Sequence, residues 1–240
     1  MEESVIYRSC RQGGIRYAEA VSQDGKPFAW NFQERFYMPA APIWEQLALC
    51  TKFTPADLAS VFGRYNGPLY VEIGIGNGEF TAHRAVLEPD SRWLGFEVFH
   101  EVFYKAVSRI KRAGLNNVRL MQFDAELFVR MLPEGSVTGF YVNFPDPWPK
   151  SRHKKRRLLK LWFMELMRDR LAPGGLITVV TDHDDYAEEI SENFARTEDI
   201  ESTLGAPYLN NLGDYYKTKY YRKFAANSRV YFFNMKKVSK

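Results

Sequence analysis

From residue 68 onward, short apolar runs alternate with longer segments whose apolar positions recur at helical spacing. Short runs rich in β-branched and aromatic residues predict buried strands, and a 3.6-residue repeat predicts amphipathic helices. We expect strands at residues 69–73, 92–97, 117–123, 137–143 and 176–181. We expect helices between or after them at residues 79–87, 98–113, 154–171 and 185–196.

The two ends of the chain depart from this alternation. Residues 215–224 and 229–236 predict two more strands around a turn at 225–228, whereas residues 1–60 mix aromatic, charged and proline positions. Strands that alternate with helices favour a mostly parallel, Rossmann-like α/β sheet of seven strands, with helices on both faces and an antiparallel C-terminal β pair. We therefore expect one domain at 61–240 and an N-terminal arm at 1–60, with a short helix near 43–49, that packs on or near it.

Composition narrows the class of protein. The 240 residues are 45% hydrophobic, which allows one domain with a full-sized core. The two cysteines, Cys10 and Cys50, are too few for a disulfide scaffold or a cysteine-rich zinc site and fit a reducing compartment. There is no apolar run of roughly 18 residues and no signal-peptide pattern at the start. We expect a soluble cytoplasmic protein with no metal site.

The net charge of +4 hides a strong asymmetry. Residues 147–164 hold seven lysines and arginines and no acid, and residues 215–240 hold eight and no acid. These two segments carry +15, so the other 196 residues carry −11. Such segregation points to a polyanionic partner.

The first predicted strand runs into a glycine-rich turn with acidic neighbours. Three glycines would let the backbone turn sharply and approach a ligand, although a glycine turn alone also occurs without one. Glu72 before the loop and Glu79 just inside the following helix would repel a dinucleotide phosphate and suit a cation, which favours S-adenosylmethionine over NAD. Glu72, Glu97 and Asp124 also lie at three successive strand ends. Singly, each acid could be a solvated strand end. The predicted cofactor-binding residues are Glu72, Gly74, Gly76, Gly78, Glu97, Asp124 and Ala125.

The strand at 137–143 leads into a loop of three prolines that also holds Asp146 and Trp148. Prolines fix the backbone, so this loop is either a stiff connection or a rigid substrate platform. A basic run follows at once and, standing alone, could be a solvated face or a targeting signal. Beside a reacting site it suits a substrate with phosphates on either side of the target, and Trp148 and His153 could stack on bases.

The segment from Phe144 to Arg157 closely resembles the signature of the bacterial tRNA (guanine-N7)-methyltransferase family. The glycine loop, Glu97, Asp124 and Asp182 fall in the family's order and spacing, and the resemblance covers about residues 25–237. It implies a class I methyltransferase that uses S-adenosylmethionine to methylate N7 of a variable-loop guanine in tRNA, as a monomer or homodimer.

The resemblance also implies roles for individual residues. Asp146 matches the proposed catalytic residue and, with the acids above, a position around the cofactor. Substrate-contacting positions match Lys150, Asp182, Thr218, Lys219 and Tyr220, but Tyr221 stands where the family has Glu. The RNA-interacting stretch matches Arg152, His153, Lys154, Lys155, Arg156 and Arg157.

Three alternatives stay open at this stage. A methyltransferase acting on protein or a small molecule would not need two acid-free basic segments. An NAD-dependent oxidoreductase is disfavoured by Glu79, just inside the first helix. A non-catalytic or retargeted RNA-binding relative is supported by Tyr221 alone.

Overall fold

The computed structural model describes residues 6–12, 15–21, 36–37, 59, 61–210, 212–213 and 215–238, with side chains from residue 59 onward. The short helix expected near 43–49 lies outside the described residues. The strands are β1 (Ile6–Gln12), β2 (Ile15–Val21), β3 (Phe36–Tyr37), β4 (Leu69–Ile73), β5 (Arg92–Phe96), β6 (Val118–Met121), β7 (Val137–Asn143), β8 (Leu171–Thr181), β9 (Ile200–Ser202), β10 (Leu209–Asn210) and β11 (Tyr231–Lys237). The helices are α4 (Glu79–Leu87), α5 (His100–Arg112), α6 (Ala125–Met131), α7 (Leu161–Arg170) and α8 (Asp184–Arg196).

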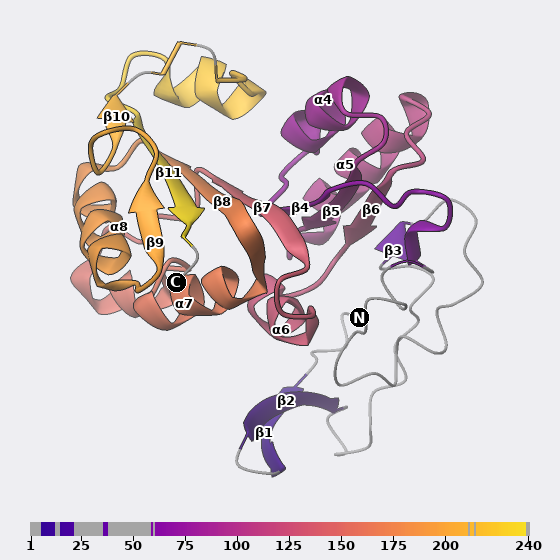
Figure 1. The fold of residues 1–240 in the computed structure, drawn as a ribbon, viewed down its shortest axis with the longest axis horizontal. Coiled ribbons are helices and arrows are strands. Elements are labelled where there is room, and N and C mark those ends of the chain that lie inside the picture. Colours follow the sequence, from indigo (N-terminus) through magenta and orange to yellow (C-terminus); the bar gives the residue numbers. More distant parts are fainter. Residues whose placement is uncertain are drawn as a thin grey trace.

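One twisted sheet forms the body of the protein (Figure 1). Strands β6, β5, β4, β7 and β8 run parallel in that order, which confirms the predicted Rossmann-like alternation. Strand β11 pairs antiparallel with β8, and β3 pairs antiparallel with β6, so an antiparallel strand flanks the parallel set on each side. With the short β9 and β10 the sheet has nine strands where the sequence suggested seven. Strands β1 and β2 form a separate two-stranded antiparallel sheet.

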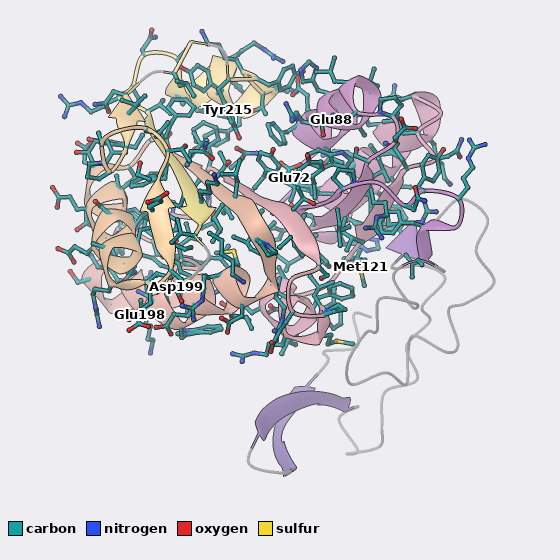
Figure 2. All side chains as sticks on the ribbon, in the orientation of Figure 1. Glu72, Glu88, Met121, Glu198, Asp199 and Tyr215 are labelled. Atoms are coloured by element: carbon teal, nitrogen blue, oxygen red, sulfur yellow. The ribbon has the colours of Figure 1, made fainter. Side chains whose placement is uncertain are left out.

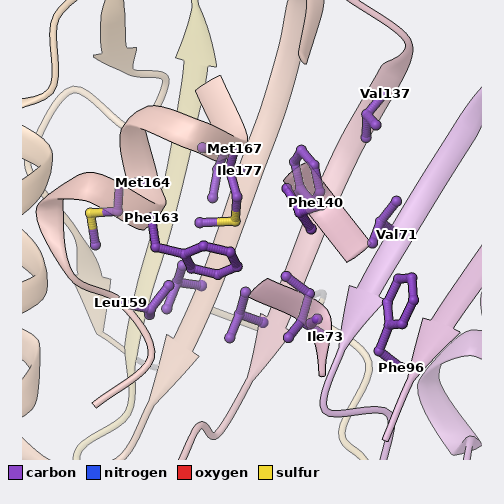
Figure 3. Close-up of a cluster of buried hydrophobic side chains, with 14 of the residues drawn as sticks. Val71, Ile73, Phe96, Val137, Phe140, Leu159, Phe163, Met164, Met167 and Ile177 are labelled. Carbon is purple, nitrogen blue, oxygen red and sulfur yellow. The ribbon is translucent and has the colours of Figure 1, made fainter. Parts of the chain in front are cut away.

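Helices cover both faces of the sheet, as predicted. Helices α6, α7 and α8 bury one face in a cluster that includes Val71, Phe140 and Phe163 (Figure 3). Helices α4 and α5 bury the other face around Trp93, which is fully buried. Alternate side chains of the central strands therefore enter separate apolar layers, as a buried parallel sheet requires.

The helix predicted at 154–171 is wrong in its first half. A 3₁₀ segment covers Ser151–Arg156, and α7 begins only at Leu161. Between them the chain is held by tertiary contacts: the Leu159 amide donates to the Tyr186 hydroxyl at 3.0 Å, and the Leu159 side chain is buried. These contacts with α8 replace the hydrogen bonds that a continuous helix would have made.

The predicted strand at 215–224 is also wrong. Residues Tyr221–Ala225 form a π-helical turn, which buries Tyr221 and Ala225 against Val180 and Phe232. The antiparallel partner of β11 is therefore β8 and not the segment before it. Helix α6 was not predicted, because it is only seven residues long. Among the described residues, no helix is long and apolar enough to cross a membrane.

Candidate active site

The candidate site lies where the order of the parallel strands reverses. Strand β4 lies between β5 and β7; β6 lies next to β5, and β8 lies next to β7. In such sheets, the carboxyl ends of the strands at this point diverge and leave a crevice for a ligand. The Asn143 amide at the end of β7 donates to the Glu72 carboxylate of β4 at 3.1 Å, so a polar bridge spans this point.

The glycine loop after β4 is shaped to receive a ligand. Gly74 and Gly76 have φ of 74° and 55°, and a Cβ built on either would meet no atom within 4 Å. Their backbone therefore faces open space in a conformation that glycine favours. Gly78, with φ of 72°, has a different role: a Cβ there would lie 2.9 Å from that of Ala106, so this glycine lets α4 and α5 approach.

Three predicted acids are brought within electrostatic reach of one another. Burial is the main cause of the raised pKa of Glu72 and of Glu97. In addition, the charge of Glu97 raises the pKa of Glu72, and the charge of Asp146 raises the pKa of Glu97. Glu72 is only 2% exposed, and burial raises its pKa to about 7 although Thr81 and Asn143 hydrogen-bond to it. Carboxylates that crowd in this way gain from a cation between them.

Glu97 is fixed by the backbone around it. One carboxylate oxygen accepts from the Gly76 amide at 3.0 Å, and the other accepts from the amides of Val98 and Phe99 at 2.9 and 3.0 Å. The acid thus ties the glycine loop to the end of β5. Asp124, exposed after β6, accepts from the Glu126 amide at 2.8 Å as the N-cap of α6, and Ala125 is the first, buried residue of that helix.

The C-terminal segment reaches back over the site through contacts that the sequence did not indicate. The Tyr215 hydroxyl donates to the Asn143 side-chain oxygen at 2.6 Å, so Tyr215, Asn143 and Glu72 form one chain of hydrogen bonds. Figure 2 shows Tyr215 on the C-terminal segment near the strand end that carries Glu72. The Tyr215 ring stacks on Phe80 of α4 at 5.5 Å. This aromatic contact anchors the segment on the far side of the glycine loop.

Glu79 is a second anchor for this segment. Its carboxylate accepts from the Tyr216 hydroxyl at 3.1 Å and from the Lys219 amide at 2.7 Å, and pairs with Arg222 at 2.7 Å. Burial alone would raise the pKa of Glu79, but the hydrogen bonds from Arg222 and Lys219 bring it below its ordinary value. Glu79 therefore binds the protein's own tail, whereas the sequence had placed it among acids facing a cationic ligand.

The predicted substrate-contacting residues of the tail lie beside the proline loop. The Tyr220 ring lies 4.8 Å from that of Phe144, and its pKa is raised mainly by burial and further by Asp182, which follows β8. Tyr221, the position that departs from the family pattern, is buried, and its ring lies 6.1 Å from Phe144. Thr218 hydroxyl accepts from the Tyr221 amide at 3.3 Å. Tyr221 thus packs against Phe144 at the start of the proline loop, and it has no carboxylate to offer a substrate.

The proline loop places Asp146 at the surface between these parts. Phe144 and Trp148 both have positive φ, 51° and 42°, which is uncommon for residues with bulky side chains and is found where surrounding structure holds a functional loop. Trp148 is covered by its own neighbours: Arg156 lies 5.0 Å from the ring centroid, and His153 packs edge-on at 5.8 Å. These contacts place the basic 3₁₀ segment against the loop that carries Asp146.

The basic segment divides into exposed and buried members. Lys150, Arg152, Lys155 and Arg156 are exposed, whereas His153 and Lys154 are half-buried. The prediction that Arg157 contacts RNA does not fit the structure, because its side chain is fully buried. Its guanidinium donates to the Pro147 carbonyl at 2.7 Å and pairs with acids of α8, namely Asp185 and Glu189. Arg157 therefore positions the proline loop on α8.

Comparisons with known proteins bear on the class. A family described as "Putative methyltransferase" matches residues 66–233. The solved structure of the antibiotic-resistance methyltransferase Kmr superposes with a TM-score of 0.54 at 16% identity, over 79% of this chain and 95% of Kmr. The fold, the open glycine loop and the crowded acids define a class I methyltransferase that uses S-adenosylmethionine.

Curated relatives specify the family. A protein of Geobacter metallireducens named tRNA (guanine-N(7)-)-methyltransferase is 38% identical over 78% of this chain and 89% of its own length. A protein of the same name from Alkalilimnicola ehrlichii is 38% identical over 70% of this chain and 71% of its own. The chain belongs to the tRNA (guanine-N7)-methyltransferase family.

Proposed function

We propose that this protein transfers a methyl group from S-adenosylmethionine to N7 of a guanine in tRNA. The observation that carries the proposal is the relationship to the Geobacter protein of that name along most of both chains. The site supports it, because acids that suit a cationic cofactor lie next to an exposed basic segment that suits RNA.

The residues present fit the cofactor. The open backbone of Gly74 and Gly76 would receive its methionine part, and Glu97 at the end of β5 would accept hydrogen bonds from the ribose hydroxyls. Glu72, Glu97 and Asp146 supply negative charge around a sulfonium and an ammonium. Asp124 and Ala125 at the end of the neighbouring strand would lie at the adenine. When bound, the cofactor supplies an electrophilic methyl group on a cationic sulfur.

The chain's own task is mostly positioning and electrostatics. Guanine N7 has a free lone pair and no proton, so its attack on the methyl carbon needs no strong general base. The guanine would gain the methyl group at N7 and, with it, the positive charge that the cofactor gives up. Asp146 would accept hydrogen bonds from the guanine N1–H and amino groups, with Asp182 nearby, and so stabilise that charge and aim N7 at the methyl group.

Tyr221 in place of Glu does not remove the acids proposed for this task. Burial is the main cause of the raised pKa of Tyr220, and the charges of Asp182 and Asp146 raise it further, which supports a role for both acids near this ring. We therefore assign guanine recognition to these two acids and not to the position of Tyr221.

The protein would act in the cytoplasm, and the two predicted domains, 1–60 and 61–240, remain our proposal for its organisation.

The test is methyl transfer to bulk tRNA with labelled cofactor, followed by identification of the labelled nucleoside. Label in 7-methylguanosine is expected, and label in another nucleoside would contradict the proposal. Asp146→Ala should lose most transfer while cofactor binding, measured separately, persists. The matched control is Asp90→Ala, an exposed acid just before β5 at the opposite edge of the sheet, which should leave transfer unchanged.

A further inference from the structure

The π-helical turn has two unlike faces. Tyr221 and Ala225 are buried on the sheet, whereas Tyr220 and Phe224 are 44% and 58% exposed. Burying a phenylalanine side chain stabilises a protein, so an exposed Phe224 forgoes that gain. A lone exposed apolar residue needs no explanation, but this one belongs to an ordered row.

The row leads outward from the proline loop. The ring of Phe144 lies 4.8 Å from that of Tyr220, and the ring of Tyr220 lies 5.2 Å from that of Phe224. Phe144 directly precedes the segment that holds Asp146, and Phe224 is therefore the outermost of three linked rings that start at the proposed reaction centre.

A lysine lies beside the outer end of this row, in a basic segment. The Lys223 ammonium lies 5.0 Å from the centroid of Phe224, and Lys217 and Lys219 belong to the same segment. Residues 215–240 contain no acid, so an acidic protein segment or a nucleic acid is favoured over a neutral apolar partner. A flat ring beside ammonium groups matches a nucleotide, because the base stacks on the ring and the phosphate meets the charge.

We propose that Phe224, together with Tyr220, is a stacking platform for a nucleobase of the substrate RNA next to the reacting guanine. The proposal rests on the function proposed above and adds a contact outside the reaction centre. The stacked base is a neighbour of the target and not the target itself, because Tyr220 separates Phe224 from the loop that carries Asp146.

The test compares the tRNA affinity of three Phe224 variants with that of the wild type across a series of salt concentrations. Phe224→Ala should bind about tenfold more weakly, since one base–aromatic stack is lost. Phe224→Trp should bind as well as the wild type or better, and Phe224→Leu, which keeps apolar area without a π face, should fall between. The slope of log affinity against log salt should not change in any of them, because stacking releases no counterions.

Two controls separate stacking from charge and from folding. Lys223→Ala should lower the magnitude of the salt slope by about one unit, unlike the Phe224 variants. Val86→Ala removes a side chain that is equally exposed on α4 and should change nothing. Phe224→Ala should keep the wild-type thermal stability and cofactor affinity, because its side chain is not part of the core.

An abasic nucleotide on either side of the target guanine locates the partner. Removing the stacked base should weaken binding to the wild type but not to Phe224→Ala. The platform is refuted if wild-type protein methylates guanine N7 while Phe224→Ala binds tRNA equally well. It is also refuted if Phe224→Ala alters self-association and not tRNA affinity. Absence of any methyl transfer by the wild type would instead refute the proposed function.

Discussion

Replacing Glu72 by glutamine isolates the most deeply buried acid of the site. The side chain is 2% exposed and bridges Thr81 of α4 and Asn143 of β7. A glutamine oxygen can keep the bond from Thr81, and its amino group can donate to Asn143 if that amide turns over. The turned Asn143 would then donate to the Tyr215 hydroxyl, which can accept as well as donate. The substitution therefore removes an ionisable group while the hydrogen-bond network persists.

The magnitude follows from the pKa. Burial raises the pKa of Glu72 from 4.5 to about 7 in the folded protein. Between these two pH values the folded state holds a proton that the unfolded state has lost, so stability falls as pH rises. At 1.36 kcal/mol per pKa unit, the wild type loses about 3 kcal/mol from this group between pH 4.5 and 7, and no more above that.

The assay is urea unfolding of wild type and Glu72→Gln at half-unit steps from pH 4.5 to 8. Other groups, including Glu126 with its pKa raised to about 7 by burial, titrate in both proteins and cancel in the difference. The variant should gain stability relative to wild type as pH rises, with the midpoint of the gain between the two pKa values. A difference that stays flat across this range would show that Glu72 is ionised throughout, and the reasoning from burial would fail.

Four further substitutions test other parts of the structure. Arg157→Met should destabilise the protein by about 2 kcal/mol in urea unfolding, because two acids of α8 lose a buried partner. The neighbouring exposed residue is the control: Arg156→Ala should weaken tRNA binding with little loss of stability. Glu79→Gln should speed hydrogen exchange at the Lys219 amide about tenfold, since it weakens three contacts to the tail; an unchanged rate would argue against this anchor. Gly76→Ala places a Cβ in the open space of the loop at positive φ, so cofactor affinity should fall more than tenfold while unfolding shifts by only about 1–2 kcal/mol. Calorimetric titration with the cofactor measures this affinity, and an affinity equal to that of the wild type would contradict the expectation.

Local pattern was sufficient for the parallel core. The apolar runs that became β4, β5, β6 and β7 are bounded by polar or glycine residues, and each lies within a residue or two of its predicted range. The strand-end acids were also predictable, because the carboxyl ends of parallel strands share one edge of a sheet. The charge asymmetry likewise placed the basic segment next to the proline loop, since the two are contiguous in the chain.

Local pattern failed where distant segments compete for the backbone. Residues 157–160 have helical composition, but contacts with Tyr186 and the acids of α8 hold them extended. The aromatic run at 215–224 has strand composition, but Asn143 and Glu79 draw it across the site instead.

The sequence by itself determined the fold class, the glycine loop and which acids line the strand ends, because these depend on neighbours along the chain. Only the tertiary structure decided what each charge does. Glu79 binds the tail, Arg157 is a buried brace, and Phe224 is left exposed at the end of an aromatic row. A side chain's charge is given by the sequence, but its partner and its burial are set by residues that lie up to 143 positions away.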